Sequence, residues 1–329
     1  MISVVIPTYR RSRTLPAAIA SAAGQDYPAF EVLVVDNAAD PAVEALVDAV
    51  AVVAPVSVRY IAEPSLGLHN ARHAGARAAT GDVLVYTDDD ATFDPGWLAA
   101  YARAFVEHPE MAAAGGPIRP AWDVPPPRWF LDYVDDCFDA LPLLSLMEPY
   151  DGFRLDAGGW FYGANMAVRR DVLFRLGGFN PEMFGADFVG DGETGLNLKL
   201  WATGALVGYV PGAVVHHHVP PSRMTPAYIR RRLADQAACD LYTRFQRDGV
   251  PSRRVLIAEA ARTAAANARF VAAAPVFGEQ TDGRALFVRA RAAETVTRVR
   301  YLLRLATSPW LRSLVDQRDW LTDASKEAP

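Results

Sequence analysis

Three consecutive carboxylates, Asp88-Asp89-Asp90, stand directly after a short apolar run at residues 83–86. Adjacent carboxylates repel one another unless a cation lies among them, and hard divalent ions prefer oxygen ligands. A metal ion held by the first and third could bridge two phosphates and neutralise a diphosphate as it leaves a substrate. A triplet by itself could also be a solvated acidic turn. Because the run before it has the composition of a buried strand, we expect the turn to face a crevice and to bind metal.

Two further carboxylates, Asp191 and Glu193, precede a segment with helical apolar spacing at residues 194–202. A carboxylate at such a junction could take the proton of a hydroxyl group as its oxygen attacks an electrophilic carbon. Either residue could instead only favour the positive N-terminus of the helix. Asp187 is a third candidate for the base, and the residue types alone leave all three open.

Three of the six histidines form one run, His216-His217-His218. Tandem histidines at a strand end are often surface residues, whereas a neutral imidazole is a common metal ligand. An imidazole that completes a carboxylate site would suit Mn²⁺ better than Mg²⁺. We therefore expect a divalent metal ion, Mn²⁺ or Mg²⁺, as the cofactor.

The elements that must position these groups alternate along the first third of the chain. The predicted strands are residues 3–6, 31–35, 56–61 and 83–86, and the predicted helices are residues 14–23, 43–52, 68–79 and 96–107. Such alternation implies right-handed crossovers and a parallel sheet covered by helices on both faces. In open sheets of this kind ligands bind at the carboxyl ends of the strands, where Pro7-Thr8-Tyr9, Asp36 and the aspartate triplet lie.

The rest of the chain changes character twice. Residues 115–153 combine several prolines with aromatic residues and predict a long ordered loop with a short helix, whose rings could stack on an acceptor or only anchor a lid. A second α/β portion follows at residues 157–219, with helices predicted at 171–176 and 193–203. After Pro226 the sequence is almost wholly helical, and Pro251 and Pro275 divide it into about three long helices.

Composition excludes some classes of function. Hydrophobic residues make up 51 % and charged residues 22 % of the 329, which is typical of a globular protein. A net charge of −5 argues against nucleic acid as the main partner. Two cysteines and no recognisable signal peptide predict reduced thiols and a cytoplasmic location. The basic amphipathic segment at residues 284–304 could pack on the catalytic domain, contact the inner face of a membrane, receive an anionic acceptor, or form a homodimer.

Short motifs also occur in a fixed order along the chain. They are Val4-Val5-Ile6-Pro7-Thr8-Tyr9-Arg10, Val34-Val35-Asp36-Asn37, Asn70-Ala71-Arg72, Asp88-Asp89-Asp90, Gly163-Ala164-Asn165, Gly177-Gly178-Phe179, Gly190-Asp191-Gly192-Glu193 and Val215-His216-His217-His218-Val219-Pro220. In this order they resemble the signature of inverting family-two glycosyltransferases with the GT-A fold. The resemblance covers roughly residues 2–232, and the combined order is far more specific than any single motif.

The resemblance implies a role for each matching residue. Pro7, Thr8 and Tyr9 would line the nucleotide-base pocket, Asp36 would accept a hydrogen bond from the base, and Arg72 would reach the base or the diphosphate. Asp88, Asp89, Trp160 and Asn165 would contact the rest of the nucleotide sugar. Asp88, Asp90 and His217, favoured over its two neighbours, would bind the metal. Asp191 would be the catalytic base, at the Asp of an Asp-x-Glu-x-x-Leu pattern.

Some of these roles have structural alternatives. Asp36 could only cap the following turn, and Arg72 could be an exposed helix charge. The chain also departs from the family pattern at Asn37-Ala38-Ala39, where a second acidic residue and Gly-Ser are frequent, and at His73, where Asn is frequent. These departures affect the preference for base and sugar more than the reaction.

The sequence therefore predicts an α/β protein with a GT-A fold, a Rossmann-like and mostly parallel sheet flanked by helices, with a helical C-terminal extension. The expected catalytic domain is residues 1–225, with a nucleotide-sugar half (1–115) and an acceptor-side half (116–225), and the extension is residues 226–329. The expected reaction is inverting transfer of a hexose from a UDP-sugar to a glycan, lipid-linked or small-molecule acceptor. The alternatives are a nucleotidyltransferase, which would normally have a glycine-rich loop after the first strand, and a catalytically silent nucleotide-sugar-binding protein.

Overall fold

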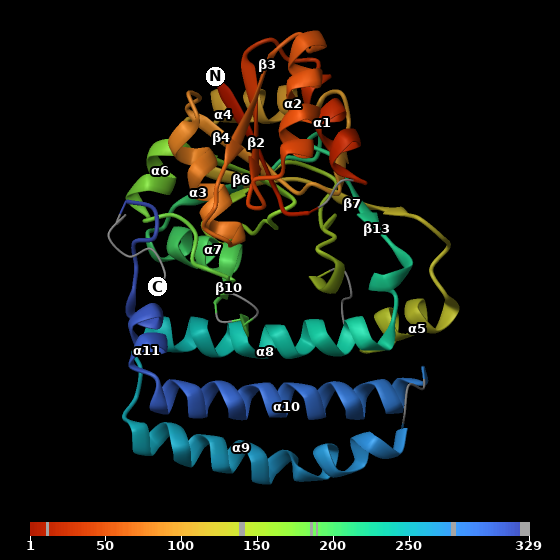
Figure 1. Cartoon of the computed structure of the whole chain (residues 1–329), viewed down its shortest axis with the longest axis vertical. Coiled ribbons are helices and arrows are strands. Elements are labelled where there is room, and N and C mark those ends of the chain that lie inside the picture. Colours follow the sequence, from red (N-terminus) through yellow and green to blue (C-terminus); the bar gives the residue numbers. More distant parts are fainter. Residues whose placement is uncertain (11–12, 138–141, 185–186, 189, 278–280, 323–329) are drawn as a thin grey trace.

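The computed structural model describes residues 1–10, 13–137, 142–184, 187–188, 190–277 and 281–322. Figure 1 shows a sheet with helices on both faces, and a stack of long helices that lies beyond one edge of this α/β unit. Among the described residues, no helix is both long and apolar enough to cross a bilayer.

The central sheet has eight strands in the order β3-β2-β1-β4-β9-β6-β12-β8. The strands of the chain are β1 Ile2–Thr8, β2 Phe30–Asp36, β3 Ser57–Ala62, β4 Val83–Thr87, β5 Ala91–Phe93, β6 Met111–Gly115, β7 Ile118–Trp122, β8 Arg154–Asp156, β9 Asn165–Arg169, β10 Met183–Phe184, β11 Asp187–Phe188, β12 Leu206–Tyr209 and β13 Val215–Val219. The pairs β1–β2, β2–β3, β1–β4 and β6–β12 are parallel, whereas β9 runs antiparallel to both β4 and β6. The four strands predicted in the first third and the mostly parallel sheet are confirmed.

Helices cover both faces of this sheet. They are α1 Leu15–Ala23, α2 Pro41–Val53, α3 Leu68–Ala78, α4 Trp97–Glu107, α5 Arg128–Cys137, α6 Arg170–Arg175, α7 Gly192–Ala202, α8 Pro226–Asp248, α9 Arg253–Ala273, α10 Gly283–Thr307 and α11 Pro309–Asp316, with short 3-10 turns η1 Pro142–Leu144, η2 Pro221–Arg223 and η3 Ala274–Phe277. Helices α1, α2 and α4 share one apolar core with the sheet, and α3, α6 and α7 share the other. The near-continuous buried runs of β1, β2 and β4 follow from this double cover.

A second, three-stranded sheet fixes the position of the histidine run. Strand β13 pairs with β5, which directly follows the aspartate triplet, and with β7. His217 is opposite Ala91 in this ladder, and the backbone N–H of His218 donates to the carbonyl of Asp90 at 2.8 Å. Two segments more than a hundred residues apart therefore meet at the carboxyl edge of the central sheet.

The C-terminal helices form a layered stack, with α8 next to the α/β unit and α10 between α8 and α9 (Figure 1). Their shared core includes Leu241, Tyr242, Phe245, Leu256 and Leu302. The other end of α8 packs through Ile229 and Leu233 on Phe130 and Tyr133 of the aromatic loop. The prediction of about three long helices is confirmed, and α11 adds a short fourth.

Candidate active site

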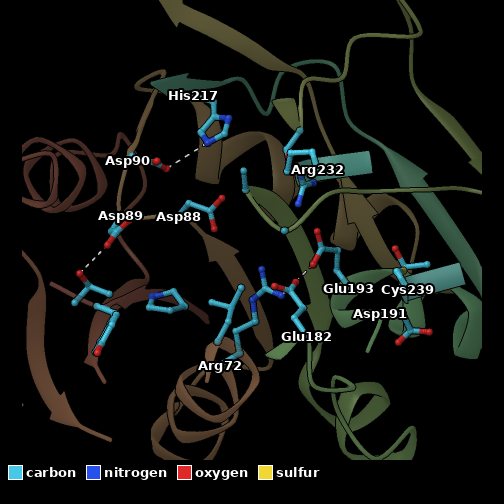
Figure 2. Close-up of a pocket in the computed structure, with 18 of the residues that line it drawn as sticks. Arg72, Asp88, Asp89, Asp90, Glu182, Asp191, Glu193, His217, Arg232 and Cys239 are labelled. Carbon is cyan, nitrogen blue, oxygen red and sulfur yellow. Dashed lines mark hydrogen bonds and ion pairs between the residues drawn. The ribbon is translucent and has the colours of Figure 1, made fainter. Parts of the chain in front are cut away.

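A pocket of about 400 Å³ opens where the strands end and α8 crosses below them. Its wall combines the end of β1, the aspartate triplet, His217 of β13, the start of α7 and one face of α8 (Figure 2). The face of α8 contributes Tyr228, Arg232, Gln236 and Cys239. The predicted groups therefore meet in one place, and the helical extension forms part of the same wall.

Asp88, Asp90 and His217 form a group with metal-ligand geometry, because one ligand atom from each lies within 4.8 Å of the others. His217 Nε2 is 3.3 Å from Asp90 Oδ1, and both side chains are 3 % exposed. Burial, and then the repulsion from Asp90, raises the pKa of Asp88. A divalent cation among these groups would offset that repulsion.

The tautomer of His217 supports this assignment. Its Nδ1 lies 3.1 Å from the carbonyl oxygen of Leu144, which can only accept a hydrogen bond, so Nδ1 carries the proton of the neutral ring. The lone pair of Nε2 then faces Asp90. A backbone carbonyl that fixes the second ring nitrogen is the usual support of a metal-binding histidine. Two carboxylates and this imidazole suit Mn²⁺ and fit the expected cofactor.

The alternation of side chains along β13 separates the three histidines. His216 and His218 point away from His217 and bond Asp94 and Asp123, respectively. Since successive residues of a strand face opposite sides, only the middle histidine of this run can face Asp90.

A pair of carboxyl groups lies across the pocket from this group. Glu193 accepts a hydrogen bond from the Glu182 carboxyl. It also forms an ion pair with Arg72, whose Nη1 lies 3.3 Å from Glu193 Oε2. Burial, followed by the repulsion of Glu193, raises the pKa of Glu182 to about 8. Burial also favours the neutral form of Glu193, but Arg72 and the bond from Glu182 outweigh this and lower its pKa. The pair therefore shares one proton at neutral pH.

Two glycines make room for this pair. A Cβ on Gly163 would lie 2.2 Å from Arg72 Nη2, and one on Gly192 would lie 2.3 Å from Glu182 Oε1. Gly192 also has a φ of +50°, a backbone conformation that side chains disfavour. The glycines of these two motifs thus allow Arg72, Glu182 and Glu193 to meet.

Comparisons with known proteins identify the family to which this chain belongs. The family model for glycosyl transferase family 2 matches residues 3–176, more than half of the chain. The chain belongs to glycosyl transferase family 2. The succinoglycan biosynthesis protein ExoM of Rhizobium meliloti is 28 % identical over 234 residues, 70 % of this chain and 71 % of that protein. A glucosyl-dolichyl phosphate glucuronosyltransferase of Haloferax volcanii is 27 % identical over 221 residues, 66 % of this chain and 68 % of its own length.

A solved structure confirms the fold of this glycosyltransferase. The mannosyltransferase PcManGT of Pyrobaculum calidifontis, in complex with GDP-Man and Mn²⁺, superposes with a TM-score of 0.53 at 21 % identity. The match covers 95 % of this chain and 72 % of that one. The GT-A fold predicted from the motifs is therefore confirmed.

Asp191, the predicted catalytic base of this glycosyltransferase, lines the pocket and also holds two neighbouring side chains. Its Oδ1 accepts from Asn180 at 2.8 Å and its Oδ2 accepts from Thr243 of α8 at 2.8 Å, and the residue is only 4 % exposed. Asn180 also bonds Gln246 of α8. In Figure 2 Glu193 lies between Asp191 and Asp88. The Asp191 carboxylate therefore also holds α8 to the catalytic domain, and both Asp191 and Glu193 line the pocket. The side chain of Asp187 is outside the described residues.

Asn165, expected beside the donor sugar, lies in the core. Its amide nitrogen donates to the carbonyls of Pro117 and Ala213, and its amide oxygen accepts from Trp97 and Tyr101. The residue has no exposed surface, so the expectation of a donor contact is wrong. Asn165 instead ties together β9, α4 and the loops that lead to β7 and β13.

We expect Asn165→Ala to lower the free energy of unfolding by at least about 3 kcal/mol, because four buried polar groups lose their partner at once. Urea unfolding followed by circular dichroism would measure this loss. Asn267→Ala is the control, since Asn267 of α9 bonds only the Thr263 carbonyl of its own helix among the described residues and should cost less than about 1 kcal/mol. Equal losses in the two variants would contradict the structural role.

Asp36 and Trp160 also lie outside the pocket wall. The Asp36 carboxylate accepts from the backbone N–H groups of Ala38 and Asp40 and from the Tyr60 hydroxyl, and it is fully buried. It therefore caps the turn after β2, the alternative left open by the sequence. The Trp160 ring packs against Tyr162 and Trp201 in a separate, smaller hollow.

The remaining predicted residues line the pocket. Pro7, Thr8 and Tyr9 stand at the end of β1, and the Thr8 hydroxyl donates to Asp89 at 2.7 Å. Arg72 is 2 % exposed, so it is not the surface charge that the sequence also allowed. Sequence reasoning missed Glu182, Arg223 and Arg232, which also line the pocket. No motif marked them, although Glu182 follows the Gly177-Gly178-Phe179 motif closely.

Proposed function

We propose that this glycosyltransferase moves a hexose from a nucleotide sugar to an acceptor hydroxyl by a single displacement that inverts the anomeric centre. The observation that carries the proposal is the pocket itself. The group formed by Asp88, Asp90 and His217 faces a carboxyl pair, Glu182 and Glu193, across one cavity. Such an arrangement can stabilise a leaving diphosphate on one side and accept a proton on the other.

In this proposal the donor is a UDP-sugar, with its base against Pro7 and Tyr9 at the end of β1. Asp88, Asp90 and His217 would hold a divalent ion, Mn²⁺ by preference, which would supply positive charge next to the diphosphate. Arg72 lies between this group and the carboxyl pair. Its Nη1 forms an ion pair with Glu193, and the negative charge of Asp88 also attracts the Arg72 guanidinium group. It therefore positions Glu193 and adds positive charge beside the sugar.

Glu193, assisted by Glu182, is the proposed general base in place of Asp191. The acceptor oxygen forms a bond to the anomeric carbon while the bond from that carbon to the phosphate oxygen breaks. The hydroxyl proton passes to the carboxyl pair, and the nucleoside diphosphate leaves with the electron pair of the broken bond. An α-linked donor then gives a β-linked product, and no covalent sugar–enzyme intermediate is formed.

The acceptor would enter beside α8, where Tyr228, Arg232 and Gln236 line the pocket. The two curated relatives are named for succinoglycan biosynthesis and for glucuronosyl transfer to glucosyl-dolichyl phosphate, which supports a glycan or lipid-linked acceptor over a small molecule. We propose a cytoplasmic enzyme that meets a lipid-linked acceptor at the inner face of the membrane, with the C-terminal helices as the contact to membrane or to a second subunit.

Calorimetric titration of UDP, GDP and dTDP, each with and without Mn²⁺, tests the donor site. We expect UDP to bind at least tenfold more tightly in Mn²⁺ than in EDTA, because the ion offsets the charge of the diphosphate. GDP and dTDP are the controls for the base. If no nucleotide bound to the folded protein in Mn²⁺, the proposed function would fail.

A further inference from the structure

The guanidinium group of Arg223 lies against two of the three residues of the metal group. Its Nη2 is 2.8 Å from Asp90 Oδ2, and its Nη1 is 3.0 Å from His217 Nε2. Because His217 Nδ1 carries the ring proton, Nε2 accepts this second bond. The planar fork of arginine thus satisfies a carboxylate and an imidazole with two parallel donors.

A metal ion bound by Asp90 and His217 needs the same lone pairs. His217 Nε2 has a single lone pair, so it cannot accept from Arg223 and bind a metal ion at the same time. The Arg223–Asp90 pair is well buried, with side-chain exposures of 17 % and 3 %, so its electrostatic interaction is only weakly screened. A metal ion must therefore displace the Arg223 head group.

The surroundings of Arg223 indicate where its guanidinium group can move when it is displaced. Arg223 ends the short turn η2, whose backbone is held by bonds from Arg223 N–H to the Pro220 carbonyl and from Met224 N–H to the Pro221 carbonyl. The side chain can thus swing while the backbone stays in place. It lines the same pocket as Asp88 and Arg232, where the donor diphosphate of the proposed function would lie.

We propose that Arg223 is an exchangeable counter-cation: it pairs with Asp90 and His217 until a metal ion takes them, and then pairs with the donor diphosphate. The inference rests on the proposed nucleotide-sugar donor. Charge balance supports it, because a divalent ion neutralises Asp88 and Asp90 and frees one arginine charge for the two negative charges of a diphosphate diester. Metal and nucleotide then assist each other, since each favours the same position of Arg223.

Binding of Mn²⁺ alone and of UDP in saturating Mn²⁺, measured by calorimetry, tests the exchange without an activity assay. Arg223→Gln should bind Mn²⁺ alone about tenfold more tightly than the wild type, since the competitor is gone, and should bind UDP in Mn²⁺ about tenfold more weakly. Arg223→Lys is the second variant. One ammonium group cannot serve Asp90 and His217 as the fork does, so Mn²⁺ alone should again bind more tightly, with a smaller loss of UDP affinity.

Arg232→Gln is the matched control. Arg232 lines the same pocket, but within the described part of the chain it makes no hydrogen bond or ion pair to Asp90 or His217, and its Nε is buried without a partner. The affinity of the Arg232→Gln variant for Mn²⁺ alone should stay within twofold of that of the wild type. Unchanged or weaker Mn²⁺ binding in both Arg223 variants, with unfolding midpoints near that of the wild type, would overturn the exchange. If the wild type bound Mn²⁺ but no nucleotide, the proposed function would fail, and with it the diphosphate half of the exchange.

Discussion

Asp90→Ala is expected to abolish Mn²⁺-dependent UDP binding and to lower the rate of sugar transfer by about a thousandfold. The Asp90 carboxylate is 3 % exposed and contacts both His217 and Arg223. Loss of the Asp90 carboxylate removes one of the two anionic ligands of the metal ion and leaves Arg223 without a carboxylate partner. Loss of a fixed charge that stabilises a leaving group typically costs a factor of about 10² to 10³. Calorimetry and initial rates, both in saturating Mn²⁺, would measure the two effects.

The histidine run offers a matched pair of controls for this site. His217→Ala should resemble Asp90→Ala in weakening Mn²⁺ binding, whereas His216→Ala should bind Mn²⁺ and UDP as the wild type does. His216 is the adjacent residue of β13, and its ring bonds Asp94 on the opposite side of the strand. Equal behaviour of the two histidine variants would show that the metal group has been assigned to the wrong residues.

The parts of this site that the sequence predicted are those fixed by short-range rules. Thr8, Tyr9 and the aspartate triplet follow buried strands, and the carboxyl ends of parallel strands meet at one edge whatever the loops do. The alternation of side chains in a strand likewise selects one histidine of three, once the register of β13 against β5 is known. The sequence supplies the alternation but not that register, which is why the choice of His217 depended on the resemblance.

The parts that the sequence did not predict depend on long-range packing. Glu182 reaches Glu193 only because Gly192 leaves space and has a positive φ, and Arg223 reaches Asp90 only because β13 pairs beside it. Asp191 is the N-cap residue of α7 and Gly192 has a φ of +50°, so regular helical spacing does not fix the directions of the Asp191 and Glu193 side chains. Both line the pocket, and the partner that Asp191 finds in Thr243 depends on where α8 lies.

Glu193→Gln is expected to lower the rate of transfer by about a thousandfold while the dissociation constant for UDP in Mn²⁺ stays within about threefold. A carboxamide keeps the size of the side chain but cannot accept the acceptor proton, and general base catalysis contributes a factor of about 10² to 10⁴. Asp191→Asn is the control. We expect it to retain at least a tenth of the rate and to unfold at lower urea, because Asp191 accepts hydrogen bonds from Asn180 and from Thr243 of α8.

The pH dependence distinguishes a carboxyl pair from a single base. Burial and the repulsion of Glu193 raise the pKa of Glu182 to about 8. Below that pH the pair already holds one proton, and a second proton would have to bind next to the charge of Arg72. The value of kcat/KM should therefore rise with pH, reach half of its maximum near pH 8 and level off only at higher pH. In Glu182→Gln this rise should be lost, because the carboxamide does not titrate, and the rate should stay low from pH 6 to 9.

The two carboxylates at the start of α7 make opposite predictions, and one comparison decides between them. If Asp191→Asn lost transfer and Glu193→Gln kept it, Asp191 would be the base and would accept the proton on a lone pair that Asn180 and Thr243 leave open. If only Glu193→Gln lost transfer while UDP binding stayed intact, Glu193 would be the base that accepts the proton of the acceptor hydroxyl. We expect the second result, because both oxygens of the Asp191 carboxylate already accept a hydrogen bond from a neighbouring side chain.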